Sequence, residues 1–337
     1  MPDNDATPTD LPRLQAALGA RATLKTWSEG AELIELLRTA HQAGWLVRLR
    51  EPVRAQELAA LGDAPVERVA NILDVLTAAG VTARTSDGYR LTDGFDAFVA
   101  GDTGVDLGES LDAVDLMRSR IAQPDEPVTG AQALVVARDW GIGPTEAARE
   151  LYQALYAAIP EYRARLEQGG PLLDVGCGIG AAVLSTATMY PALRAVGVEM
   201  VPEVAAQTRR RAQQFGVADR VEIRTADART LTDKSAFEVS FWAQPFFQPD
   251  TRSATLAVIL RALRPGGLLI CQELFPPVSE EDESNVRARL DRLFIEELGG
   301  SFGRTAEELV AETKAAGFGD QEIVVTPLGR LVVSRTP

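Results

Sequence analysis

The apolar residues of this 337-residue chain follow a helical period in the first half and a strand period in the second. Residues 31–45, 55–62 and 65–79 place apolar side chains three and four positions apart, which predicts three amphipathic helices. Alternating residues on either side of Ser86-Asp87-Gly88 predict a hairpin with a tight turn. The first hundred residues are therefore expected to form a small helical unit with one hairpin.

The second half alternates short apolar runs with helical stretches. The five runs that are short enough for buried strands are 172–175, 195–199, 221–227, 237–241 and 267–272. Between the two halves, helical patterns cover 107–121, 131–139 and 145–166. Strands that alternate with helices predict an α/β fold with a parallel sheet.

The turn after the first of these runs is the most informative stretch of the chain. Gly176, Gly178 and Gly180 occupy every second position, and glycine lets the backbone bend sharply and lets a ligand approach it closely. Ligands of open α/β sheets bind at this end of the strands. Gly176, Gly178 and Ala181, with Glu199 further along, also satisfy the dinucleotide fingerprint, so the turn alone leaves an NAD site open.

Three acids follow three successive strands of the predicted sheet. Asp174 precedes the glycines, while Glu199 and Asp227 end the second and third runs. A carboxylate such as Glu199 can accept both ribose hydroxyls, and Asp227 can accept from an adenine amino group. Acids attract an ammonium group but repel a pyrophosphate. This end of the sheet therefore suits a cationic nucleoside cofactor better than NAD.

From about residue 170 to its end, the chain resembles the class I S-adenosylmethionine-dependent methyltransferases. The resemblance rests on Asp174 with the three glycines, on Glu199, on Asp227 and on the 263–267 turn before the fifth strand. It implies a Rossmann-like sheet of seven mostly parallel strands with a C-terminal antiparallel hairpin, and S-adenosylmethionine as cofactor. The cofactor site that it implies contains Asp174, Gly176, Cys177, Gly178, Gly180, Glu199, Met200, Asp227, Ala228 and Trp242.

The residues after the fourth strand depart from the pattern of this family. Many of its small-molecule O-methyltransferases use a histidine base there, whereas this chain has Gln244, and its single histidine, His41, is expected at the surface of the first helix. We expect Gln244 to orient the acceptor. If a carboxylate acts as the base, Glu273, after the fifth strand, is the best-placed candidate.

Aromatic residues follow several strand ends on the ligand side. Trp242 is expected to place its ring near the cofactor's sulfonium, a cation–π arrangement. The predicted substrate pocket contains Tyr152, Tyr156, Gln244, Phe246, Phe247 and Phe275. For the aromatic residues of this set, packing in the core is the alternative interpretation.

The N-terminal unit resembles the winged-helix dimerisation domain of the same enzymes. We expect a disordered tail over 1–12, the winged-helix domain over 13–100, a helical linker that roofs the pocket over 101–168, and the cofactor domain over 169–337. Winged helices often bind DNA, but the formal net charge is −14, and residues 28–100 hold seven Arg, no Lys and eleven acids. This balance argues against a phosphate-binding face.

The composition of the chain narrows the remaining classes of protein to which it could belong. The chain has no apolar run of about 18 residues, so we expect no membrane span. Its two cysteines, Cys177 and Cys271, predict neither a disulfide framework nor a metal site, and they suit a reducing cytoplasm.

The sequence therefore predicts a homodimeric enzyme that transfers a methyl group from S-adenosylmethionine to the O, N or C atom of a small molecule. The missing histidine favours acceptors that need little base assistance, such as a carboxylate, an amine or an acidic carbon. The two-domain resemblance further implies a place in specialised metabolism. A NAD-dependent oxidoreductase and a non-catalytic ligand-binding regulator remain the alternatives.

Overall fold

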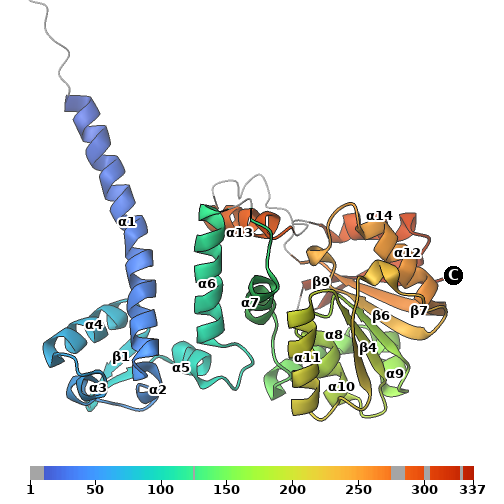
Figure 1. Cartoon of the computed structure of the whole chain (residues 1–337), viewed down its shortest axis with the longest axis horizontal. Coiled ribbons are helices and arrows are strands. Elements are labelled where there is room, and N and C mark those ends of the chain that lie inside the picture. The colour runs from blue at the N-terminus through green and yellow to red at the C-terminus, as the bar shows by residue number, and fades with distance from the viewer. Residues whose placement is uncertain (1–10, 124–125, 275–284, 300–303, 327–328) are drawn as a thin grey trace, which may run out of the picture. The chain divides into compact units, whose positions relative to one another are not determined.

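The computed structural model describes residues 11–123, 126–274, 285–299, 304–326 and 329–337. The chain divides into two units, Met1–Ala100 and Gly101–Pro337 (Figure 1). None of the helices in the described ranges combines the length and the apolar character needed to cross a membrane.

The first unit consists of helices and the predicted hairpin. Its elements are α1 (Leu11–Gln42), α2 (Trp45–Arg48), α3 (Ala55–Gly62), α4 (Val66–Ala78), β1 (Thr82–Thr85), β2 (Gly88–Leu91) and α5 (Asp93–Ala100). Thr82 pairs with Leu91 and Thr85 with Gly88 in the antiparallel hairpin. Leu46, Leu58 and Leu73 are fully buried and bring α2, α3 and α4 together.

Helix α1 is much longer than the periodicity over 31–45 predicted. It begins at Leu11 and continues for 32 residues, although residues 11–30 are almost all exposed. This stretch has four Ala, four Leu and two Arg, which favour the helix by intrinsic propensity. A hydrophobic-face criterion misses such a segment because none of its positions has to be buried.

The second unit contains a seven-stranded sheet of the predicted topology. The strand order is β5-β4-β3-β6-β7-β9-β8, with β3 (Leu172–Val175), β4 (Ala195–Glu199), β5 (Val221–Thr225), β6 (Phe237–Trp242), β7 (Leu263–Gln272), β8 (Gly319–Thr326) and β9 (Gly329–Arg335). Neighbours from β5 to β7 pair in parallel, whereas β9 lies antiparallel between β7 and β8. The strands β3, β4 and β5 therefore end at one edge, where the predicted acids lie.

Helices cover both faces of this sheet (Figure 1). One core contains side chains of α8 (Glu146–Ala157), α9 (Pro160–Glu167), α10 (Ala181–Met189) and α11 (Pro202–Gln214), and the other contains side chains of α12 (Arg252–Ala262) and α14 (Ala306–Ala315). Leu172 belongs to the first core and Leu173 to the second. Side chains alternate along a strand, so Asp174 lies on the same face as Leu172, toward α8.

The remaining helices of this unit are α6 (Leu107–Ala122), α7 (Gly130–Trp140) and α13 (Val286–Glu297), which share a small core. The single helix predicted over 145–166 is wrong. The chain forms α8 and α9 instead, and α9 begins at Pro160. Proline cannot donate the helical hydrogen bond and clashes with the preceding turn, so it ends one helix and starts the next.

Candidate functional site

The glycine turn between β3 and α10 has the backbone that its sequence requires. Gly176, Gly178 and Gly180 have φ angles of 75°, 53° and 86°, a region that disfavours residues with a Cβ atom. A Cβ atom at position 176 would come 2.8 Å from the Phe247 ring, and one at position 180 would come 2.7 Å from Leu184. Position 178 has no such neighbour within 4 Å. Two glycines thus permit close packing. The Gly178 amide and carbonyl are bonded to Glu199 and Thr208, but the space on its Cβ side is open to a ligand.

Asp174, two residues before this turn, is a buried carboxylate. Its relative exposure is 1%, and within the described part of the chain neither carboxylate oxygen accepts a hydrogen bond of good geometry, although the Val183 amide is near enough to lower its pKa. Burial raises the pKa of Asp174 to about 7, and the nearby Glu199 charge contributes to the rise. A carboxylate in this position is costly when ionised, and an approaching cation would remove the cost.

Glu199, at the end of β4, points its carboxylate at the glycine turn. Its Oε2 accepts from the Gly178 amide at 3.2 Å and its Oε1 from the Val201 amide at 2.8 Å. Burial raises the pKa of Glu199, although these amides act in the opposite direction. Each oxygen keeps a further lone pair, so the group can still accept from a diol. The adjacent Met200 side chain is 66% exposed.

The third predicted acid, Asp227, already has a partner. Arg229 donates to both of its oxygens, and this pairing lowers the pKa of Asp227. Asp227 also caps the short helix η1 (Ala228–Thr230), whose Ala228 is buried. An adenine amino group would share this carboxylate with Arg229.

The aromatic residues after β6 have separate environments. Trp242 is completely buried, with the Arg252 guanidinium 4.8 Å from its ring centroid and the Phe247 ring edge-on at 5.5 Å. A protein cation thus covers the indole, so the structure does not favour its predicted place beside the sulfonium. Phe246, in η2 (Gln244–Phe246), is 48% exposed and lies 5.3 Å from the Trp140 ring of α7. Sequence reasoning missed Trp140, which nothing in its local pattern distinguishes from a core residue.

The two tyrosines of α8, Tyr152 and Tyr156, also differ in their environments. Tyr156 is 2% exposed, and its hydroxyl is 2.5 Å from the Thr186 hydroxyl of α10. It belongs to the core that includes Tyr162, so the structure favours the packing alternative for Tyr156 over a pocket role. Tyr152 is only partly buried; burial raises its pKa, and the Asp174 charge raises it further. Tyr152 is therefore the more accessible of the two tyrosines and lies within the electrostatic influence of Asp174.

Cys177, in the glycine turn, directs its thiol into the sheet. A Cβ atom at Gly197 of β4 would come 2.9 Å from the Cys177 sulfur, and burial raises the thiol pKa well above its usual range. Only its backbone is left for the predicted cofactor contact. Phe247 likewise packs against the turn itself, since its ring fills the space beside Gly176.

Gln244 and Glu273, the predicted catalytic pair, are both held by other parts of the protein. Gln244 is 1% exposed and donates through Nε2 to the Gln272 carbonyl at 3.1 Å, while its Oε1 has no donor in the described ranges. Glu273 accepts from Arg330 at 2.7 Å and from the Ala306 amide at 2.9 Å, and Arg330 lowers its pKa. A lowered pKa makes a weaker base, so the geometry gives Glu273 a structural role in place of the predicted one. Phe275 lies outside the described residues.

Helix α7 covers the cofactor end of the sheet through two glycines. A Cβ atom at Gly130 would come 2.1 Å from the carboxylate of Glu203, in the first turn of α11. One at Gly141, just after α7, would come 2.5 Å from Ile179 of the glycine turn. The helix thus packs closely at both ends and carries Trp140 toward Phe246.

Comparison with known proteins agrees with this geometry. A family model described as "Methyltransferase domain" matches residues 172–267, from the start of β3 into β7. Residues 172–267 therefore form a methyltransferase domain. This domain contains the glycine turn and all three acids that follow the first strands.

Among curated proteins, the carboxy-S-adenosyl-L-methionine synthase of Enterobacter sp. (strain 638) is 32% identical to this chain over 123 residues. The match covers 35% of this chain and 48% of that protein, so the chain spans about half the length of the curated relatives it matches.

Two solved structures share the fold over nearly the whole chain. The mitomycin 7-O-methyltransferase MmcR is 19% identical with a TM-score of 0.67, and the alignment covers 96% of this chain and 100% of MmcR. Human N-acetylserotonin methyltransferase, solved in complex with S-adenosylmethionine, is 14% identical with a TM-score of 0.64, and the alignment covers 99% of each chain. At these identities the likeness shows a common fold.

The residues of the methyltransferase domain fit this cofactor. Its amino-acid end carries an ammonium group, and Asp174 offers a buried carboxylate that accepts no hydrogen bond of good geometry in the described ranges. Its ribose carries two hydroxyls, and Glu199 retains acceptor capacity on both oxygens. The Gly178 amide donates to Glu199, and the space on the Cβ side of Gly178 is open.

Proposed function

We propose that the protein transfers a methyl group from S-adenosylmethionine to a small-molecule acceptor. The observation that carries this proposal is the buried Asp174 carboxylate, whose oxygens have no hydrogen bond of good geometry, two residues before a glycine turn with open space at Gly178. When bound, the cofactor supplies a methyl group on a positively charged sulfur, which is already electrophilic. The protein's part is to orient the cofactor through Asp174 and Glu199, to hold the acceptor in line and to exclude water.

The acceptor needs no strong base from the two predicted catalytic residues. Gln244 does not accept a proton at neutral pH, and Glu273 is held by Arg330. This supports an acceptor that is already nucleophilic at neutral pH: a carboxylate, an amine or an acidic carbon. The exposed Phe246 ring beside Trp140 supports an acceptor with an apolar, flat surface. We place this reaction in specialised metabolism.

Titration calorimetry tests the cofactor. We expect S-adenosylmethionine or its demethylated product, S-adenosylhomocysteine, to bind in the micromolar range, and NAD to give no heat of binding. A panel of carboxylates, amines and phenols, analysed by mass spectrometry for an increase of about 14 Da, then identifies the acceptor class. Tight NAD binding without a response to S-adenosylmethionine would refute the proposal in favour of the oxidoreductase alternative.

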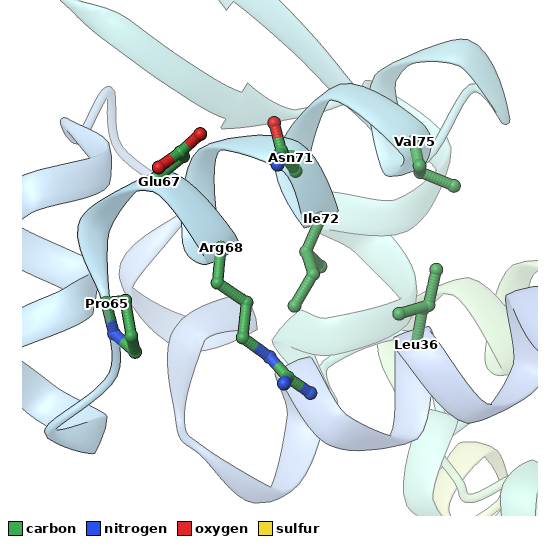
Figure 2. Close-up of a pocket in the computed structure, with 7 residues that line it drawn as sticks. All are labelled: Leu36, Pro65, Glu67, Arg68, Asn71, Ile72 and Val75. Atoms are coloured by element: carbon green, nitrogen blue, oxygen red, sulfur yellow. The ribbon is translucent and has the colours of Figure 1, made fainter.

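We also propose that two chains pair through the first unit. Leu14, Leu24 and Trp27 are 55%, 61% and 70% exposed along α1. A groove of about 490 Å³ lies between α1 and α4, where Ile72 and Arg68 point from α4 toward the helix that carries Leu36 (Figure 2). Exposed large apolar side chains and an open groove on one small unit are typical of a self-association surface. Light scattering should give about twice the 36.2 kDa chain mass, and a strict monomer at high concentration would refute pairing.

The charge balance of residues 28–100 supports the further proposal that nucleic acid is not a partner. A mobility-shift assay with duplex DNA at low salt should show no complex, because electrostatic binding is strongest there. A salt-sensitive complex with DNA at sub-micromolar protein would revive the regulator hypothesis.

The two cysteines are buried and unbridged, which supports a reducing compartment as the site of action.

A further inference from the structure

Arg252, the first residue of α12, is a buried arginine whose guanidinium is engaged on every side. Its side chain is 3% exposed. Nε donates to both carboxylate oxygens of Glu312 in α14, at 2.9 and 3.2 Å, and Nη2 completes this pair at 2.5 Å. Nη1 donates to the Gln244 backbone carbonyl at 2.7 Å. The flat face of the group lies over the Trp242 ring.

Two of these contacts, with the Trp242 ring and the Gln244 carbonyl, are made to the chain segment that leaves β6. Trp242 is the last residue of β6, and Gln244 begins η2. The same segment continues to Phe247, whose ring stands edge-on to Trp242 and fills the space beside Gly176. The Ala243 amide also donates to the Val175 carbonyl at 3.0 Å, directly before the glycine turn. Arg252 therefore holds the segment that forms one wall of the cofactor turn.

We propose that Arg252 is a positioning residue for cofactor binding, acting through Gln244, Trp242 and Phe247 on the glycine turn. The proposal rests on the proposed function, since it assigns Arg252 to the same cofactor site. Lysine cannot replace arginine here, because one ammonium cannot pair with Glu312, reach the Gln244 carbonyl and stack on the indole together. Glu312 pairs with the Arg252 guanidinium and fixes its orientation, so it is the second residue that we expect to position the segment.

A second arginine–glutamate pair provides a matched control. Arg335, at the end of β9, donates to both carboxylate oxygens of Glu161 at 2.8 and 2.6 Å. It lies beside Gly266 and pairs in register with Leu268 of β7, level with the first residue of β3, so it lies at the end of the sheet opposite the glycine turn. Arg335→Lys loses a two-point pair with a glutamate, at a more exposed position, without touching the segment after β6.

The experiment measures the Kd for S-adenosylhomocysteine by calorimetry, and thermal unfolding, for wild type, Arg252→Lys, Glu312→Gln and Arg335→Lys. We expect Arg252→Lys to bind about tenfold more weakly, Glu312→Gln about threefold more weakly, and Arg335→Lys within about twofold of wild type. All three variants lower the melting temperature, so stability alone would not separate them.

The outcomes distinguish this inference from the proposed function. If wild type binds S-adenosylhomocysteine and all three variants bind it as tightly as wild type, Arg252 is only a stabilising residue and the inference is refuted. If wild type itself does not bind S-adenosylhomocysteine, the proposed function fails and takes the inference with it. If Arg252→Lys does not fold, Glu312→Gln decides: weaker binding than Arg335→Lys supports the inference, and equal binding refutes it.

Discussion

The acids around the carboxyl ends of the strands form two groups that differ in their partners. Asp174 accepts no hydrogen bond of good geometry in the described ranges, and Glu199 accepts only from backbone amides. Glu273 and Glu312 are each bound by an arginine, Arg330 and Arg252 respectively. All four side chains are carboxylates. The oxygens of the first group can still accept hydrogen bonds from a ligand, whereas those of the second group are occupied by arginines that stabilise the fold. Partners, and not residue type, thus separate binding acids from structural ones.

The largest effect is expected from a substitution that removes the charge of Asp174 and keeps its shape. The folded pKa of about 7 lies above the unfolded value of about 3.9, so the stability from the protonated carboxyl is present below about pH 4 and lost as the pH rises to 7. Asp174→Asn should therefore raise the free energy of unfolding at pH 8, by on the order of 3 kcal/mol, with a smaller gain at pH 5. Denaturant unfolding at both pH values measures this.

The same substitution should have the opposite effect on the cofactor. Without the carboxylate, affinity for S-adenosylmethionine should fall by about 10- to 100-fold, because a charge-assisted contact is lost. A variant that is less stable at pH 8, or that binds as well as wild type, would place Asp174 in the structural group.

Glu199 provides the second test. Glu199→Ala should weaken S-adenosylmethionine binding by about 1.5–3 kcal/mol, the value of a charged hydrogen-bonding group. Calorimetry measures the difference directly. Glu199→Gln, which keeps the acceptor oxygen but not the charge, is the control and should lose less. Unchanged affinity in both variants would show that the ribose is held elsewhere.

Glu273 should behave as a structural acid. Because Arg330 lowers its pKa, its contribution to stability is present above about pH 4.3 and is lost as the pH falls. Glu273→Gln should cost about 1 kcal/mol of unfolding free energy at pH 7 and leave turnover within a few fold. Glu307→Gln, which removes a more exposed partner of the same arginine, should cost less. A loss of turnover by two orders of magnitude would restore Glu273 as the base.

The smallest effect is expected at His41. Its side chain is exposed at the end of α1, so His41→Ala should leave turnover within a few fold once an acceptor is known. A general base typically contributes 10²–10⁴-fold, which makes the two outcomes easy to separate in a steady-state assay. A thousandfold loss would mean that the first unit contributes to the reaction.

The architecture followed from the sequence because its signals are local. Alternating runs, the glycines at 176, 178 and 180, and the acids at strand ends each depend on residues close together in the chain. Pro160 was an equally local signal for a helix boundary, but the prediction of a single helix over 145–166 did not take it into account. The exposed start of α1 carried none, since propensity without burial leaves no periodic pattern.

The partners of the site residues did not follow from the sequence. Arg330 meets Glu273 from 57 positions away, and Arg252 meets Glu312 from 60. Trp140 and Phe246 come together from different helices. Such contacts arise only when the sheet brings distant segments to one edge. The sequence therefore identifies which acids are available, while tertiary pairing decides which of them remain free.

The contact between Phe247 and Gly176 has a consequence for how this protein can diverge among its descendants. Position 176 is restricted twice, by its φ of 75° and by the Phe247 ring that fills the space a side chain would need. Position 247 is restricted only once, since a smaller residue there merely leaves a gap. Divergence at this pair should therefore run one way: phenylalanine shrinks in some lineages while glycine stays fixed, and an alignment of homologues would show variation at 247 without compensating growth at 176.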